Sequence, residues 1–241
     1  MRLHLAESME PRKHDNFDEF ARDYDDVHAQ TLDISGADRD YFSEYKIEEM
    51  ARHEDVSSNL SMLDFGCGDG NSVKYMRKFF PKADLNGTDV SELSIKEADA
   101  KKIPGAKFKP YDAVTLPFED NQLDVVFTSM VFHHISFDLH DGILKEIHRV
   151  LKPGGRFYIF EHNPLNPVTR KIVRECEFDH DAILLPHKYT NKMLDKGGFT
   201  SRNIWFTLFL PRHWIFRWAL MTERLIQWLP IGAQYYVRAV K

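Results

Sequence analysis

Cysteine is scarce in this chain of 241 residues, which holds only Cys67 and Cys176. Cys67 lies inside a glycine-rich stretch, where a disulfide would interfere with a tight turn. We therefore expect both thiols to be free and the protein to work in a reducing compartment, the cytoplasm.

Long apolar runs and excess positive charge are also missing. No run of about 18 apolar residues occurs, and residues 1–13 have no apolar segment, so we expect neither a membrane span nor a signal peptide. The formal net charge of −5 argues against a nucleic-acid partner, which would need a basic surface. The length suits one domain with additions.

The most informative stretch that is present runs from Leu63 to Gly70 and reads Leu-Asp-Phe-Gly-Cys-Gly-Asp-Gly. An apolar segment precedes it and helical spacing follows it, which predicts a strand, a turn and a helix. Its glycines let the backbone turn sharply and approach a ligand. Asp64 at the strand tip would repel a pyrophosphate but suits a cation. The stretch therefore favours S-adenosylmethionine, with a tight turn capped by an acid as the alternative.

Further strands follow in order, and the second and third each end in an acid. Residues 83–89 predict a second strand ending in Asp89, where an acid can bind both ribose hydroxyls. Residues 108–112 end a third strand in Asp112, placed to accept from an adenine amino group. Residues 122–129 predict a fourth strand, and 149–160 a helix end, a Pro-Gly-Gly turn and a fifth strand.

Taken together, residues 60–160 resemble the class I S-adenosylmethionine-dependent methyltransferases, and within them the ubiquinone-methylase-like small-molecule group. The resemblance implies an α/β, Rossmann-like, mostly parallel sheet of seven strands in the order 3-2-1-4-5-7-6, with the last strand antiparallel and helices on both faces. Strands six and seven fall at 199–208 and 233–240. We expect an N-terminal helical cap at 1–56 and a methyltransferase domain at 57–241, with substrate-side insertions at about 163–187 and 209–230.

The cofactor in this interpretation is S-adenosylmethionine, and its product is S-adenosylhomocysteine. Ligands of such sheets lie beyond the carboxyl ends of the strands. The expected cofactor-binding residues are Tyr24, Asp64, Gly66, Cys67, Gly68, Asp89, Val90, Tyr111, Asp112, Ala113, Ser129, Met130 and His134.

Two of the expected N-terminal helices bear on the same site. The family resemblance makes Tyr24, on a helix at 15–28, a lid over the cofactor, although the residue equally suits packing on the core. Lys46, on a helix at 38–52, could approach the cofactor carboxylate, but we expect it to be solvated.

The catalytic candidates follow the fourth and fifth strands. Transfer of a methyl group to a hydroxyl needs alignment and a base, and histidine titrates near neutrality. His162 is the predicted base, Glu161 could orient a histidine, and His133 is the alternative base. The resemblance places His134 on the adenine side. The polar run at 178–181, with nearby acids and histidines, matches no strong metal motif, so we expect no metal.

All four tryptophans fall between residues 205 and 228. A helix at 211–228 would carry Trp214, Trp218, Met221, Leu225 and Trp228 as one apolar stripe, with arginines beside it. The stripe suits core or lid packing, a membrane surface or lipid-linked acceptor, or a dimer contact, so either a monomer or a homodimer fits. We favour packing.

The leading hypothesis is O-methylation of a small-molecule or glycosyl acceptor. C-methylation of a quinone-like ring is the alternative. A nicotinamide-dependent reductase is disfavoured by Asp64 and by the lack of a second nucleotide-binding half.

Overall fold

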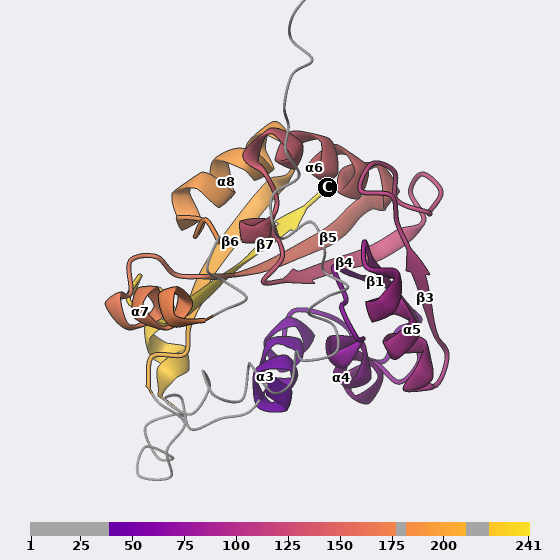
Figure 1. The fold of residues 1–241 in the computed structure, drawn as a ribbon, viewed down its shortest axis with the longest axis horizontal. Coiled ribbons are helices and arrows are strands. Elements are labelled where there is room, and N and C mark those ends of the chain that lie inside the picture. Colours follow the sequence, from indigo (N-terminus) through magenta and orange to yellow (C-terminus); the bar gives the residue numbers. More distant parts are fainter. Residues whose placement is uncertain (1–38, 177–181, 211–221) are drawn as a thin grey trace, which may run out of the picture.

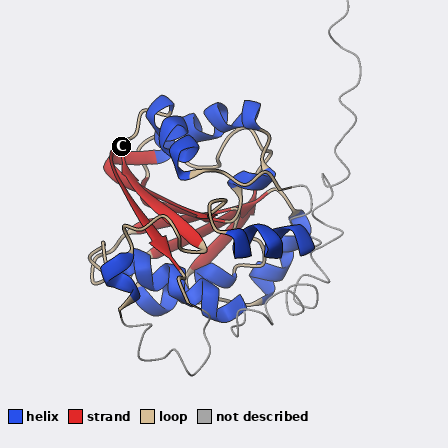
Figure 2. Cartoon of the chain, turned by 90° about the vertical axis from the view of Figure 1, so that its left-hand side faces the viewer, coloured by secondary structure: helices blue, strands red, loops and turns tan. Residues whose placement is uncertain are grey.

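The computed structural model describes residues 39–176, 182–210 and 222–241. They form one seven-stranded sheet in the order β3-β2-β1-β4-β5-β7-β6, as predicted. Figure 2 shows helices on both faces of this sheet. The strands are β1 (Ser61–Phe65), β2 (Asp84–Asp89), β3 (Ala106–Pro110), β4 (Leu123–Ser129), β5 (Leu151–His162), β6 (Thr200–Thr207) and β7 (Gln234–Val240).

Strands β1 to β5 pair in parallel, and β7 is antiparallel to both of its neighbours, β5 and β6. Parallel pairing brings the carboxyl ends of β1 to β5 to one edge, which we call the carboxyl edge. Because β7 runs the other way, its first residue lies at this edge. Helices α3 (Arg39–Ala51), α4 (Asn71–Phe79), α5 (Glu92–Ala100), α6 (Phe137–Val150), α7 (Pro167–Glu175) and α8 (His187–Lys196) connect or cover the strands, with short 3-10 turns η2 (Phe132–His134) and η4 (Glu223–Ile226).

Local signals set several helix ends. The Ser91 side chain accepts from the Ser94 N–H at 3.1 Å and caps α5, as serine commonly does. Pro81 follows the end of α4, because proline cannot continue a helix. The Asn166 side chain caps α7, whose first residue is a proline with a preset φ.

Each face of the sheet has its own hydrophobic core. Leu144 and Ile147 of α6 pack with α8 against one face. Ile47 and Met50 of α3 pack with α4 and α5 against the other, which we call the α3 face. The N-terminal helix α3 therefore shares a core with the sheet.

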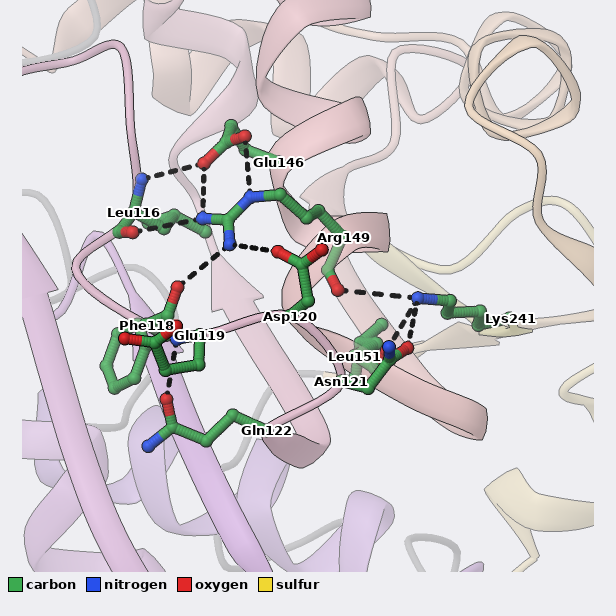
Figure 3. A network of polar contacts seen from close by, with 10 residues as sticks. All are labelled: Leu116, Phe118, Glu119, Asp120, Asn121, Gln122, Glu146, Arg149, Leu151 and Lys241. Atoms are coloured by element: carbon green, nitrogen blue, oxygen red, sulfur yellow. Dashed lines mark hydrogen bonds and ion pairs between the residues drawn. The ribbon is translucent and has the colours of Figure 1, made fainter.

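The amino end of β4 is fixed by a network around Arg149 (Figure 3). This guanidinium donates to Glu146, to Asp120 and to two carbonyls of the 116–118 loop. Lys241 donates to the Asn121 side chain and to the Leu151 carbonyl in the same region. The network lies at the opposite end of β4 from the carboxyl edge, so we assign it to stability.

The predicted Pro-Gly-Gly turn lies inside a strand. Leu123 pairs with Leu151, and Val125 pairs with Arg156, so the residues between them on β5 bulge outward. Gly154 in this bulge has a φ of 77°, which favours glycine.

Three predictions fall wholly or partly outside the described residues: Tyr24 with its helix, the polar run at 178–181, and residues 211–221 of the tryptophan-rich stripe. The described end of the stripe differs from the expectation. It forms a 3-10 turn, and Leu225 and Trp228 are 76% and 72% exposed. Packing of these two side chains on the core, which we favoured, is therefore wrong. In the described residues, none of the helices has the length and apolar content to cross a bilayer.

Candidate active site

The glycine turn follows β1 and is held against β2. The Gly66 and Cys67 N–H groups both donate to the Thr88 carbonyl, at 2.8 and 3.0 Å. Gly66 has a φ of 73°, and a Cβ there would lie 2.4 Å from a methyl carbon of Val131. Gly68, with a φ of 51°, has no heavy atom within 4 Å of its would-be Cβ. A side chain at Gly66 would therefore clash with Val131, whereas no atom of the described residues fills the space beside Gly68.

Asp64 is a buried carboxylate at the tip of β1. It is 2% exposed, and its Oδ2 has no hydrogen-bond partner within the described residues. Burial, with the nearby charges of Asp89 and Asp69, raises the pKa of Asp64 to about 8. A bound cation would favour the ionised carboxylate, whereas a pyrophosphate would be repelled. The side chain fits the ammonium and sulfonium charges of S-adenosylmethionine.

Asp89 connects the loop after β1 to the loop after β2. Its Oδ2 accepts from the Gly68 N–H at 2.9 Å, and its Oδ1 accepts from the Ser91 N–H at 3.0 Å. Each carboxylate oxygen can accept further bonds, so these contacts leave capacity for ribose hydroxyls. Val90 is exposed beside it. The ribose contact stays a prediction.

The expected adenine side contains a contact that the sequence did not indicate. The Asp112 Oδ1 accepts from the N–H groups of Val114 and Thr115, both at 2.9 Å, and closes a turn in which Ala113 has a φ of 62°. These bonds lower the pKa of Asp112, whose side chain is exposed. The side chain therefore has a structural role here, and its contact with adenine stays a prediction.

Tyr111, the residue before Asp112, is half-buried. Its ring lies 5.5 Å from that of Phe65, and burial raises the pKa of its hydroxyl to about 12. The phenol is therefore neutral over the physiological range. It lines the edge between β1 and β3.

Lys46 is buried, so the expectation of a solvated lysine was wrong. Its Nζ donates to the Ser129 Oγ at 2.8 Å, at the end of β4. The positive charge of Lys46 lowers the pKa of Asp64 and so opposes part of the rise that burial causes. The sequence held a signal for this position, because Lys46 shares one helix face with Met50, which packs into the core.

Glu161 and His133 form a fully buried pair. The Glu161 Oε2 lies 2.6 Å from the His133 Nδ1, and its Oε1 accepts from the Phe132 N–H at 3.0 Å. Neighbouring residues of a strand point to opposite faces, so Glu161 does not support His162 directly. The histidine that Glu161 contacts is His133, and the catalytic role of this pair stays a prediction.

His162 is half-buried at the end of β5, and its ring centroid lies 5.5 Å from that of His133. The His134 ring lies 4.2 Å from His133 on the other side. Met130, just after β4, has a φ of 60°, and its N–H donates to the Phe160 carbonyl at 3.0 Å. The loops after β4 and β5 therefore bring three histidines together beside Ser129.

Two polar residues that the sequence analysis did not single out lie at this edge. Gln234 of β7 pairs with His162, and Thr207 of β6 pairs with Gln234. The buried Cys67 thiol has its pKa raised by burial and does not serve as a nucleophile. Across the ranges 39–176, 182–210 and 222–241, no three His, Cys, Asp or Glu side chains are grouped to hold a metal ion.

The sheet order, the glycine turn between two acids and the cation-suited Asp64 define the class of S-adenosylmethionine-dependent methyltransferases. Comparison with known proteins agrees. Residues 63–159 match the family described as "Methyltransferase domain". An uncharacterized methyltransferase of Synechocystis is 31% identical over 175 residues, covering 70% of this chain and 78% of that protein. The chain belongs to the S-adenosylmethionine-dependent methyltransferase family, which leaves the reductase alternative without support.

A demethylmenaquinone methyltransferase of Chlorobaculum parvum is 34% identical over 158 residues, covering 65% of this chain and 62% of that protein, and supports the ubiquinone-methylase-like group. Solved structures show the same fold. A Thermotoga maritima methyltransferase, described as a possible histamine N-methyltransferase, has a TM-score of 0.66 at 18% identity, covering 93% of this chain and 98% of that one.

Proposed function

We propose that the protein transfers a methyl group to a hydroxyl of a small-molecule or glycosyl acceptor. The observation that carries the proposal is the position of His162, half-buried at the carboxyl edge beside the buried His133–Glu161 pair. An imidazole in such a place can act as a general base and remove a hydroxyl proton as the oxygen attacks the methyl group.

S-adenosylmethionine supplies an electrophilic methyl group on a sulfonium. In this proposal Asp64 balances the positive charge of the cofactor, and Asp89 binds its ribose. Gly66 and Gly68 have no side chains, so the methionine part of the cofactor can lie close to the backbone of the turn. Lys46 faces the methionine carboxylate. The burial of Asp64 and the Lys46–Ser129 bond support these roles.

His162 acts as the base, and His133 holds its surroundings in place. Glu161 and the Phe132 backbone fix the orientation of the His133 ring, which borders His162. Because the side chain of His133 is fully buried and His162 is not, His162 is the better placed of the two to meet an acceptor.

Carbon methylation is the second candidate, and the names of relatives favour it. These relatives include the demethylmenaquinone methyltransferase and a sterol 24-C-methyltransferase of Gibberella zeae, which is 27% identical over 177 residues. This chain spans 62% and 45% of those two proteins. A lipid-linked acceptor, reached through peripheral contact with a membrane, fits the exposed Leu225 and Trp228.

The experiment uses radiolabelled cofactor with catechol as the hydroxyl probe and 1,4-naphthoquinol as the ring-carbon probe. We expect methylated catechol, and a rate about 10²–10⁴-fold lower in His162→Ala. His148→Ala, a half-buried histidine on α6, is the matched control and should keep its rate. Methylation of the naphthoquinol carbon at an unchanged rate in His162→Ala would instead establish the alternative.

A further inference from the structure

Three polar side chains form one row at the carboxyl edge, on three neighbouring strands. His162 pairs with Gln234, and Gln234 pairs with Thr207. Paired residues of antiparallel strands point to the same face. The preceding row on this face contains Phe160, Tyr236 and Trp205, which belong to or pack on the core beneath α3. The polar row is therefore the next layer outward from that core.

Two members of the row have polar atoms that the protein leaves unsatisfied. Thr207 is 1% exposed and Gln234 is 9% exposed. The Thr207 Oγ1 and the Gln234 Oε1 are buried, and neither has a hydrogen-bond partner among the described residues. Buried side-chain oxygens without partners are rare in folded proteins, and each one calls for an explanation.

Several other polar groups of β7 and its surroundings are satisfied, although the His187 Nδ1 and the Asn191 Oδ1 of α8 are not. Tyr235, on the other face, donates to the Leu185 carbonyl at 2.8 Å and lies 2.6 Å from the Thr190 hydroxyl. The Asn163 amide donates to the Gly232 carbonyl at 2.8 Å, and the Gln227 amide donates to Glu49 at 2.9 Å. Thr207 and Gln234 therefore carry two unsatisfied oxygens on neighbouring strands in the row beside His162, whereas the other unpartnered oxygens of the described residues, on Asp64, Thr128 and Asn191, lie outside this row.

The chemistry of the two oxygens limits the ligand. An amide oxygen only accepts, and a threonine hydroxyl accepts or donates, so the ligand must bring hydrogen-bond donors. A fully ionised phosphate ester brings none, and an apolar ring would leave both oxygens unsatisfied. Paired side chains on adjacent strands start about 4.5–5.5 Å apart, a spacing that two neighbouring hydroxyls can bridge.

We propose that Thr207 and Gln234 form the acceptor subsite of this enzyme and bind a vicinal diol, as in a sugar or a catechol, next to His162. The subsite rests on the proposed function, because it places one diol oxygen near the proposed base. Gln234 accepts from one hydroxyl and Thr207 accepts from the other. The acceptor class is thereby narrowed from any hydroxyl to a pair of adjacent ones.

The test measures diol binding by calorimetry in the complex with S-adenosylhomocysteine. The probes are catechol and methyl α-L-rhamnopyranoside, and veratrole is the control probe because both of its oxygens are methylated. We expect both diols to bind more tightly than veratrole, and Thr207→Val and Gln234→Leu each to weaken diol binding at least tenfold. Thr200→Val, an exposed threonine of the same strand, is the matched control.

A second readout separates a subsite from a structural role. Without a diol, replacing an unsatisfied buried oxygen by a methyl group should raise the Tm by about 1–4 °C. A fall in Tm in both variants would mean that the oxygens have partners within the fold, and would overturn the proposal.

The same experiments distinguish this proposal from the proposed function. If S-adenosylhomocysteine did not bind the parent protein, the methyltransferase assignment would fail before any diol was added. If it bound, and neither diol bound better than veratrole, only the subsite would be overturned. Unchanged diol binding in Thr207→Val and Gln234→Leu would likewise overturn only the subsite.

Discussion

The cofactor side and the acceptor side of the carboxyl edge differ in how far apart their residues lie in the chain. The proposed cofactor side is made mainly from residues 64–113, in the three consecutive loops after β1, β2 and β3, with Lys46 and Ser129 beside them. The acceptor side combines His162, Thr207 and Gln234, which the pairing of β5, β7 and β6 brings into one row. One side is a set of local turns, and the other exists only when distant strands have paired.

The difference extends to how polar groups are satisfied. On the cofactor side, Asp89 accepts from N–H groups of the loops after β1 and β2, and Asp112 accepts from N–H groups of its own loop, so both hold these loops in shape. The Asp64 Oδ2 is the unsatisfied oxygen of this side. On the acceptor side, Thr207 and Gln234 leave oxygens unsatisfied. Substitutions of Asp89 or Asp112 should therefore damage the loops and cofactor binding together, whereas substitutions of Thr207 or Gln234 should weaken acceptor binding without weakening cofactor binding.

The largest effect in this comparison is expected for Asp89→Ala. The change removes a charged acceptor from two backbone N–H groups and from the proposed ribose contact. Hydrogen bonds to charged groups contribute about 1.5–3 kcal/mol, so the Kd for S-adenosylhomocysteine should rise roughly 10- to 150-fold. Calorimetry measures this directly. Asp84→Ala, at the exposed start of the same strand, is the control, and equal affinity in the two variants would refute the placement of Asp89.

A smaller effect concerns pH and Asp64. The pKa of this carboxyl in the folded protein, about 8, lies far above its ordinary value of 3.8. The folded state therefore keeps a proton that the unfolded state loses, and the stability from this group falls as pH rises from about 4 to 8. Denaturant unfolding of the parent, compared with Asp64→Asn, should show this slope only in the parent.

Cofactor binding gives the complementary readout at Asp64. A cationic ligand favours the ionised carboxylate, so binding at pH 6 should release close to one proton, measured by calorimetry in buffers of different ionisation enthalpy. Asp64→Asn should release none and bind about tenfold or more weakly. Equal proton release by parent and variant would show that Asp64 does not face the cofactor charge.

The smallest effect is expected for Trp228→Ala. Its side chain is 72% exposed, so the free energy of unfolding should change by no more than about 0.5 kcal/mol. Trp205→Ala is the matched control, because that ring stacks on Tyr236 at 5.0 Å and its loss should cost about 3 kcal/mol. Sedimentation with anionic vesicles completes the measurement, and Trp228→Ala should bind them less than the parent. A large loss of stability in Trp228→Ala would instead mean that the Trp228 side chain packs against the protein core.

The sequence predicted the parts of the molecule that depend on neighbouring residues. The Asp64-to-Gly70 turn, the Ser91 cap and the strand order all follow from spacing, local chemistry and the family resemblance. The buried position of Lys46 did not, because a lysine on an amphipathic helix is ordinarily solvated, and the bond to Ser129 spans 83 residues. The pairing of Glu161 with His133 depends on the direction in which a strand end points, which spacing alone does not give.

The position of β7 has a consequence for how the chain is made. This strand follows all the others in sequence, yet it lies inside the sheet, between β5 and β6. During synthesis, β1 to β5 can pair as they emerge from the ribosome, but β6 has no neighbour to pair with until residues 234–240 arrive. The half proposed to bind the cofactor can therefore fold first, and the half proposed to bind the acceptor is completed last, when loop closure over a long stretch of chain must be overcome.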